Sequence, residues 1–250
     1  MREDGTPTHE ESSVTAKKPV LAAAVAGVLA ITVAGCGGSG SDGAFEGMSA
    51  QEIAEQSIEA MQGLTSLTLH ATNESEEGTL EMRLSMSRDG LCTGTMALGE
   101  GETELIAVDG ESYMRANDAF WESQAGEDEQ DMAELVDGRW IRMPGGTGGF
   151  SESCDLEALL AELDAESLGE GAERADGEPV NGTDTVALIS EEGEETRTAY
   201  VAATGEPYIL RMVTEGGPDA GTATFSDFDE PVEAQAPDEE DVVDFQDLAQ

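Results

Sequence analysis

The sequence predicts an α+β fold in which a long antiparallel sheet carries most of the chain and helices cover one of its faces. Three observations predict it. From Ser66 onward, short stretches alternate apolar and polar residues with a period of two. Turn sequences such as Asp89-Gly90 and Asn181-Gly182 separate these stretches. Two further stretches, one before the first strand and one in the middle of the chain, have apolar residues at helical spacing.

The first 35 residues have the composition of a secretory signal. Lys17 and Lys18 precede an uncharged apolar run, Pro19 to Ala34, and then Val33-Ala34-Gly35-Cys36. These last four residues resemble the lipobox of bacterial lipoproteins, which implies that residues 1–35 are removed and that a diacylglycerol, with acyl chains such as palmitate, is attached to the Cys36 thiol. The resemblance places the protein at the cell membrane, lipid-anchored, on the extracytoplasmic face.

A single membrane-spanning helix is the alternative for this segment. The run of 16 residues is shorter than the ~20 that a bilayer core requires, and no basic cluster follows it. Residues 1–16 are polar and acidic, which is unusual for a signal peptide, and Val14 as an alternative start would give a more typical one.

Residues 36–48 are a flexible Gly/Ser-rich linker, and the first helix is expected after them. Ser49-Ala50-Gln51-Glu52 has the pattern of a capping box, in which the hydroxyl and the carboxylate each satisfy a free backbone N–H. Ile53, Ile58 and Met61 then fall on one face, which requires a partner surface.

The clearest predicted strand follows a strict alternation. One face carries Leu80, Met82, Leu84 and Met86. After the Asp89-Gly90 turn, the next strand has Cys92, Gly94, Met96 and Leu98 on one face, so the two strands are expected to be antiparallel neighbours that oppose the first helix.

The remaining chain divides into an insertion, a second group of strands and a tail. Residues 117–136 have a weaker pattern, and the stretch after Cys154 predicts a second amphipathic helix. Strands resume between 183 and 228. We therefore expect one domain over 49–235 and a poorly ordered acidic tail over 236–250, although its few apolar residues are sufficient for a last packed turn.

Three cysteines occur, and Cys36 is assigned to lipid. Cys92 and Cys154 then form an even pair in an oxidising compartment, which favours a disulfide. A catalytic or metal-binding thiol is the alternative, but the sequence contains no Cys-x-x-Cys motif.

The charge is strongly negative, with 55 acidic and 11 basic residues and a net charge of −44. Such a chain repels nucleic acid, which we exclude as a partner. Either a saline or alkaline environment or simply a solvated surface accounts for the acidity.

No motif of a known catalytic class is present, so the sequence predicts neither an enzyme nor a cofactor. His70 is the only histidine after the signal segment, and a lone histidine is more often structural than catalytic. The acidic runs lack the ligand spacing of a calcium loop, so no metal site is expected.

The order of elements resembles the LppX/LprG group of lipoproteins. The resemblance rests on Ala54–Leu69, on Val180–Thr185, on Gly205-Glu206-Pro207 and on Phe225–Val232. It implies a LolA-like fold, in which a curved half-barrel antiparallel sheet wraps over helices around an apolar cavity, and an activity of binding lipid chains and lipoglycans or moving them across the envelope. The extreme acidity and the pair Cys92/Cys154 depart from this group.

The sequence analysis therefore predicts a non-catalytic envelope protein that binds a lipid or other apolar ligand. Methionine side chains suit a cavity for variable acyl chains, although ordinary core packing explains them equally well. The expected ligand-binding residues are Ile53, Ile58, Met61, Leu80, Met82, Leu84, Met86, Met96 and Leu98. The alternative is a structural or signalling lipoprotein with a filled core that acts through contacts with other envelope proteins.

Overall fold

The protein is described here from a computed structural model, in which residues 45–75, 78–123, 133–143, 153–217 and 220–248 are described. The signal segment, Cys36 and most of the linker lie outside these residues. The helices are α1 (Ala50–Gln62), α2 (Asp118–Ser123), α5 (Leu156–Glu162), α6 (Ala165–Gly169) and α7 (Phe245–Leu248), with a 3-10 turn at Glu239–Asp241. The strands are β1 (Ser66–Ser75), β2 (Gly78–Ser87), β3 (Cys92–Leu98), β4 (Gly101–Val108), β5 (Glu111–Ala116), β6 (Trp140–Met143), β7 (Glu173–Asp176), β8 (Thr185–Glu192), β9 (Glu195–Ala202), β10 (Ile209–Glu215), β11 (Gly221–Ser226) and β12 (Val242–Asp244).

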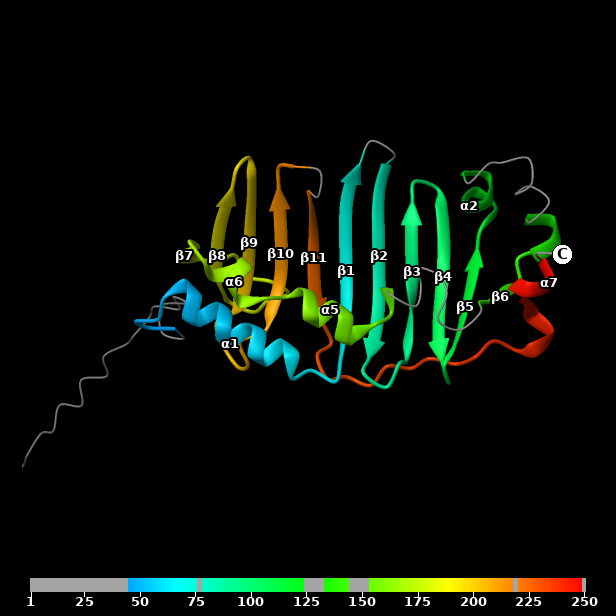
Figure 1. The fold of residues 1–250 in the computed structure, drawn as a ribbon, viewed down its shortest axis with the longest axis horizontal. Helices are drawn as coiled ribbons and strands as arrows, with labels where there is room; N and C mark the ends of the chain where they lie inside the picture. The colour runs from blue at the N-terminus through cyan, green and yellow to red at the C-terminus, as the bar shows by residue number, and fades with distance from the viewer. Residues whose placement is uncertain (1–44, 76–77, 124–132, 144–152, 218–219, 249–250) are drawn as a thin grey trace, which may run out of the picture. The chain divides into compact units, whose positions relative to one another are not determined.

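All twelve of these strands form one curved, open sheet in the order β12-β6-β5-β4-β3-β2-β1-β11-β10-β9-β8-β7 (Figure 1). Two meanders, β1–β6 and β7–β11, join where β1 pairs with β11, as in Leu69 opposite Phe225. The pairings are antiparallel except that of β12 with β6, which is parallel. The predicted α+β class with a curved antiparallel sheet and helices over one face is confirmed.

Helix α1 begins with the predicted capping box. The Ser49 hydroxyl accepts from the Glu52 N–H, and the Ser49 N–H donates to the Glu52 carboxylate at 2.8 Å. The Ser49 hydroxyl also donates to this carboxylate, and the bonds from the Ser49 N–H and hydroxyl together lower the pKa of Glu52. At the other end, the Arg88 guanidinium donates to the carbonyls of Gln62 and Leu64 and pairs with Glu157 of α5. Arg88 thus satisfies free carbonyls at the end of α1 and links it to α5.

The position of α1 corrects one expectation. The helix was expected to oppose β2 and β3, but its main contacts are with α6, α5 and β10. The physical reason is the long pairing of β1 with β11, which places the second meander beside the first and under the helix. The β2 and β3 ends nearest the β3–β4 turn are therefore left outside the cover that α1 provides (Figure 1).

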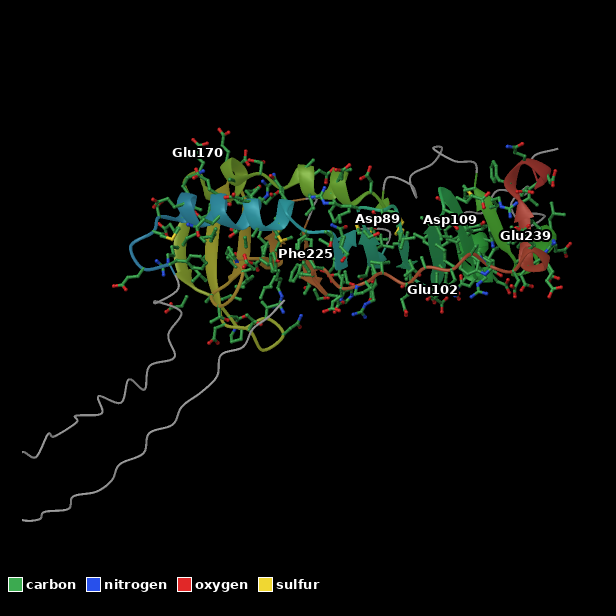
Figure 2. The ribbon with its side chains drawn as sticks, turned by 90° about the horizontal axis from the view of Figure 1, so that it is seen from below. Asp89, Glu102, Asp109, Glu170, Phe225 and Glu239 are labelled. Carbon is green, nitrogen blue, oxygen red and sulfur yellow. A yellow bond between two sulfur atoms is a disulfide. The ribbon has the colours of Figure 1, made fainter. Side chains whose placement is uncertain are left out.

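Helices α1, α5 and α6 lie on the same side of the sheet, which we call the inner face (Figure 2). One row of inner-face residues crosses the sheet in register and is buried: Phe225, Leu69, Leu84, Leu105, Met114 and Ile141. Gly94 lies in this row between Leu84 and Leu105. A Cβ there would lie 1.9 Å from the Arg83 carbonyl oxygen, so only glycine fits.

The structure contains a disulfide between Cys92 and Cys154, as the sequence predicts. Cys92, at the start of β3, has no exposed surface and belongs to the main core. Cys154 lies just before α5. The bond therefore ties the helical cover of the inner face to the sheet.

The tail contains ordered elements, β12 and α7, within the stretch that we expected to be poorly ordered (Figure 1). Asp229 accepts from the N–H and the hydroxyl of Thr65, both at 2.7 Å, where the chain leaves β11. Farther on, Ala234 and Val242 pack on the other face of the sheet, the outer face, against Tyr113 and Trp140.

The turn signals behave as the sequence predicts. Asp109 and Gly110 both have positive φ angles, of 55° and 80°, as do Asn181 and Gly182. This left-handed backbone is favourable for Gly and tolerated by Asn and Asp. Within the described ranges, no helix has the length and apolar character needed to cross a membrane.

Candidate ligand-binding face

An apolar strip crosses the inner face next to the buried row. Its members follow one another in register across five strands, from β10 through β11, β1 and β2 to β3. We call this set, with its two outer neighbours Leu80 and Leu98, the inner strip; its central members are Met212, Ala223, Ala71, Met82 and Met96.

The inner strip is apolar but incompletely covered by protein. Its five central residues are all half-buried and pack against the main core. Leu80 is also half-buried, and Leu98 is 39% exposed. Strands lie about 4.8 Å apart, so the central strip is about 19 Å long. Ala71 and Ala223 are flanked by longer methionines, so the middle of the strip is lower than its ends.

The structure divides the nine predicted ligand-binding residues into two groups. The first is buried by the protein itself, with at most 6% exposure: Ile53, Ile58, Met61, Leu84 and Met86. The second lies on the inner strip: Leu80, Met82, Met96 and Leu98. The alternation along β2 identified the inner face correctly, but it contained no information about which residues the helices cover.

Three members of the inner strip, Ala71, Met212 and Ala223, were missing from the predicted site. Ala71 continues the alternation of Leu67 and Leu69, which is a usable signal. Met212 and Ala223 belong to the second meander. Their place beside Ala71 depends on the pairing of β1 with β11, which no local pattern specifies.

Pockets also occur elsewhere in the described part of the chain. Five of them have volumes between about 290 and 620 Å³, and none of these five includes a residue of the inner strip. One is lined by Asp164, Glu166, Glu170, Ser190, Glu191, Glu192 and Arg197. The inner strip is thus an open surface rather than one of these pockets.

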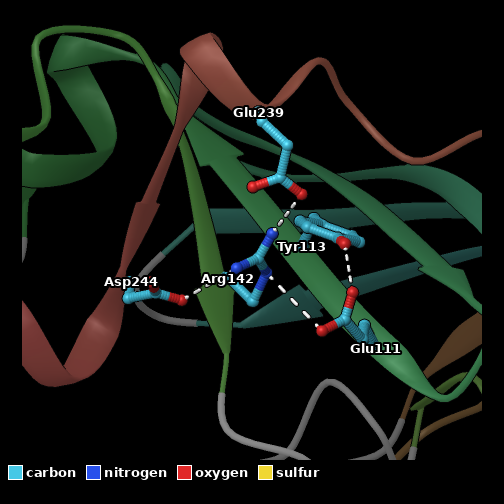
Figure 3. A network of polar contacts seen from close by, with 5 residues as sticks. All are labelled: Glu111, Tyr113, Arg142, Glu239 and Asp244. Carbon is cyan, nitrogen blue, oxygen red and sulfur yellow. Dashed lines mark hydrogen bonds and ion pairs between the residues drawn. The ribbon is translucent and has the colours of Figure 1, made fainter.

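A polar network joins the tail to the outer face at the β6 end of the sheet (Figure 3). Arg142 pairs with Glu239 at 2.8 Å, with Asp244 at 3.2 Å and with Glu111 at 3.7 Å. Tyr113 donates to Glu111 at 2.6 Å, and burial together with this carboxylate raises the pKa of the phenol. The arrangement holds β12 and the turn before it against β6.

The described residues contain no arrangement typical of a catalytic site or a metal centre. No group of three or more His, Cys, Asp or Glu side chains in the described ranges is placed to hold a metal ion. His70 Nε2 lies 3.1 Å from Glu81 Oε1, and both side chains face solvent on the outer face. No nucleophilic side chain of a described residue forms a hydrogen bond with this pair.

Comparisons with known proteins find similarity in the fold. No protein-family model matches the chain, and no curated protein matches it. The crystal structure of LprF from Mycobacterium bovis is 16% identical over 75% of this chain and 96% of that one, with a TM-score of 0.49. The lipoprotein LppX of Mycobacterium tuberculosis is 14% identical over 74% and 98%, with a TM-score of 0.46. The LolA superfamily protein NE2245 from Nitrosomonas europaea is 8% identical over 77% and 96%, with a TM-score of 0.27.

The fold thus resembles that of LprF and LppX, the group that the sequence resemblance named. At these identities the similarity concerns the fold alone. The candidate site rests on the register, burial and chemistry of this chain.

Proposed function

We propose that the protein is a membrane-anchored envelope lipoprotein that holds a lipid or other apolar ligand on the inner strip. The anchor is the lipid on Cys36, on the extracytoplasmic face, and the protein is non-catalytic. The membrane is one partner through this anchor, and the apolar ligand is the other.

The observation that carries this proposal is the half-buried state of the inner strip. Ordinary core packing buries apolar side chains as fully as it buries Leu84 and Met86, which have no exposed surface. Met82 lies one inward-facing position farther along β2 and remains half-buried, as does its register partner Met96 on β3. A row of methionine and alanine side chains is adaptable and free of hydrogen-bonding groups, which suits an acyl chain of variable length.

The second candidate is a structural or signalling lipoprotein whose inner face contacts another protein. The same exposure favours it, because contiguous apolar patches on a surface mark protein contacts as well as ligand sites. The two candidates differ in what occupies the strip: a small amphiphile for the first, a protein side-chain cluster for the second.

A matched pair of variants tests the first candidate. Met82→Glu places a charge in the middle of the inner strip, at a half-buried position where the sheet tolerates it. Glu81→Gln, at the next position but on the outer face, is the control. We expect binding of a fluorescent fatty-acid probe to fall at least about tenfold in Met82→Glu, which corresponds to ~1.4 kcal/mol, and to be unchanged in Glu81→Gln.

Circular dichroism of both variants must show the wild-type strand content. A wild-type protein that does not bind the probe, or equal binding by Met82→Glu, would favour the second candidate. The anchor is tested separately by metabolic labelling with a fatty-acid analogue. Cys36→Ala should abolish the label, and a labelled Ala variant would refute the anchor.

A further inference from the structure

Two arginines on the outer face have no polar partner in the described part of the chain, although acidic residues outnumber basic ones five to one. Arg83 is exposed and makes no hydrogen bond or ion pair with a described residue. Among the described residues, the Arg211 guanidinium contacts only the ring of Tyr200, whose centroid is 5.9 Å away. The other arginines pair with carboxylates or donate to backbone carbonyls: Arg88, Arg115, Arg142 and Arg197 in the first group, Arg139 and Arg174 in the second.

The two free arginines belong to one row. Arg211, Thr224, His70 and Arg83 are successive register partners on β10, β11, β1 and β2, so their side chains share the outer face. Three strand spacings separate the arginines, which places their α-carbons about 14 Å apart. Glu81, the carboxylate beside the row, is already held by His70. The row therefore carries two unpaired cationic side chains on a strongly anionic protein.

Hydroxyl groups surround this row. Thr68 and Ser85, two residues from His70 and Arg83 along their strands, bond to each other at 2.8 Å. They also line a hollow of about 620 Å³ between the sheet and residues 227–232, whose lining includes the acidic residues Asp227 and Glu230. Tyr208 and Phe228 line the same hollow, with ring centroids 4.5 Å apart. Thr72 and Thr222 continue the hydroxyl surface on the other side of the row.

We propose that this outer surface, from the hollow at Thr68 to the row of Arg83 and Arg211, binds a glycan with widely spaced anionic groups. Hydroxyls donate to and accept from sugar hydroxyls, and aromatic rings provide apolar surface for sugar rings. Arginine recognises carboxylate and phosphate through two parallel hydrogen bonds. The surface thus offers each kind of contact that an acidic sugar chain requires.

The net negative charge of the protein favours a ligand whose anionic groups are widely spaced. A dense polyanion such as nucleic acid would be repelled by a net charge of −44. An extended acidic peptide presents carboxylates on one side about every 7 Å, so an additional carboxylate would lie between the two arginines and be repelled by the acidic protein. A largely neutral chain with occasional anions fits both the local cations and the surrounding acidity.

This surface lies on the face opposite the inner strip, so the proposal is independent of the function proposed above. The test uses the full-length protein in neutral detergent and immobilised hyaluronan, a glycan whose carboxylates are separated by neutral sugars. Dextran, which is uncharged, and polyglutamate, which is densely charged, are the comparison probes. We expect hyaluronan to bind at least about tenfold more tightly than either.

The variant is Arg83→Gln with Arg211→Gln. Its matched control, Arg174→Gln with Arg197→Gln, changes the net charge equally at other positions. We expect hyaluronan binding to weaken at least about tenfold in the first double variant, and the control to bind as the wild type does. Thermal melts and fatty-acid probe binding should not change in the first double variant, because both arginines are on the surface and distant from the inner strip.

Three results would overturn the proposal. The first is no hyaluronan binding by the wild type, and the second is equal loss in both double variants. The third is polyglutamate binding as tight as hyaluronan binding, which would indicate an acidic protein as the partner. Single variants at Arg83 and at Arg211 should each give a partial loss, because the glycan is expected to contact both.

Discussion

Neighbouring residues of β2 enter two different environments. Leu84 and Met86 on the inner face have no exposed surface, whereas Ser85 between them is half-buried and Arg83 is exposed on the outer face. Helices α1, α5 and α6 cover the inner face in part and leave the inner strip open, and over β10–β2 the outer face presents hydroxyl and arginine side chains. The stability of the fold is therefore expected to reside on the inner face, and polar recognition on the outer one.

The faces also differ in how they are covered. Helices tied by the disulfide and by Arg88 cover the inner face. At the β6 end, the outer face is covered by the tail, which Asp229 and the Arg142 network hold in place. Apolar burial is worth roughly 25 cal/mol per Å², whereas exposed ion pairs contribute about 0–1 kcal/mol each. We therefore expect the helices over the inner face to stay bound to the sheet, and the tail on the outer face to detach more easily.

The largest expected effect contrasts the two faces directly. Leu84→Asn places an amide in the buried row without a partner, so unfolding free energy should fall by more than about 3 kcal/mol. Thr95→Asn, on the outer face of the adjacent strand, should cost less than about 1 kcal/mol. Urea titration monitored by circular dichroism measures both. Similar losses in the two variants would contradict the assignment of stability to the inner face.

The sequence predicted the local features of both faces but not the features that depend on long-range strand pairing. Alternation along β2 and β3, the capping box at Ser49 and the turns at Asp109 and Asn181 are local signals, and each is confirmed. The pairing of β1 with β11 joins Leu69 to Phe225, far apart in the chain, and no local signal specifies it. For that reason the position of α1, the members Met212 and Ala223 of the inner strip, and the row of Arg83 and Arg211 were not predicted.

The next largest effect concerns the bond between the inner face and its cover. Replacing Cys92 and Cys154 with serine should lower the free energy of unfolding by about 2–4 kcal/mol, because the unfolded chain regains the freedom that the cross-link removes. The loss should match that of the wild type measured with a reductant. Binding of a hydrophobic dye should rise as α5 loosens from β3. Free-thiol titration of the denatured, unreduced protein would argue against the bond if it detected both of these cysteines.

A smaller effect is expected where the tail leaves the sheet. The N–H and hydroxyl of Thr65 donate to Asp229 and lower the pKa of its carboxyl. Because the folded pKa is below the unfolded one, this contribution is present above the unfolded pKa of about 3.9 and is lost as pH falls through the folded value. Asp229→Asn, which tolerates the positive φ angle at this position, should cost about 1 kcal/mol at neutral pH.

The comparison is made by urea titration at neutral pH and near pH 3. The difference between wild type and Asp229→Asn should shrink at the acidic pH, where this carboxyl is already largely protonated in the unfolded chain. Thr65→Val, which removes the hydroxyl but keeps the N–H, should give part of the loss. A difference that stays constant with pH would mean that the variant acts through packing rather than through the charge.

The smallest global effect is expected from the tail network, and it tests whether the outer cover can be released alone. Arg142→Met removes the common partner of Glu239, Asp244 and Glu111, so these carboxylates would then repel one another. The cost in global stability should stay below about 1 kcal/mol, because the pairs are largely at the surface. Locally, the amides of β12 should exchange faster with solvent, and Trp140, which lies beside Val242 on the adjacent strand, should become accessible to a fluorescence quencher.

The quenching is measured in a Trp121→Phe background so that only the fluorescence of Trp140 is observed. Arg197→Met, which breaks a surface pair on β9, is the control and should leave Trp140 protected. If Trp140 stays protected in Arg142→Met, apolar contacts rather than charge hold the tail, and both faces are then closed by the same force.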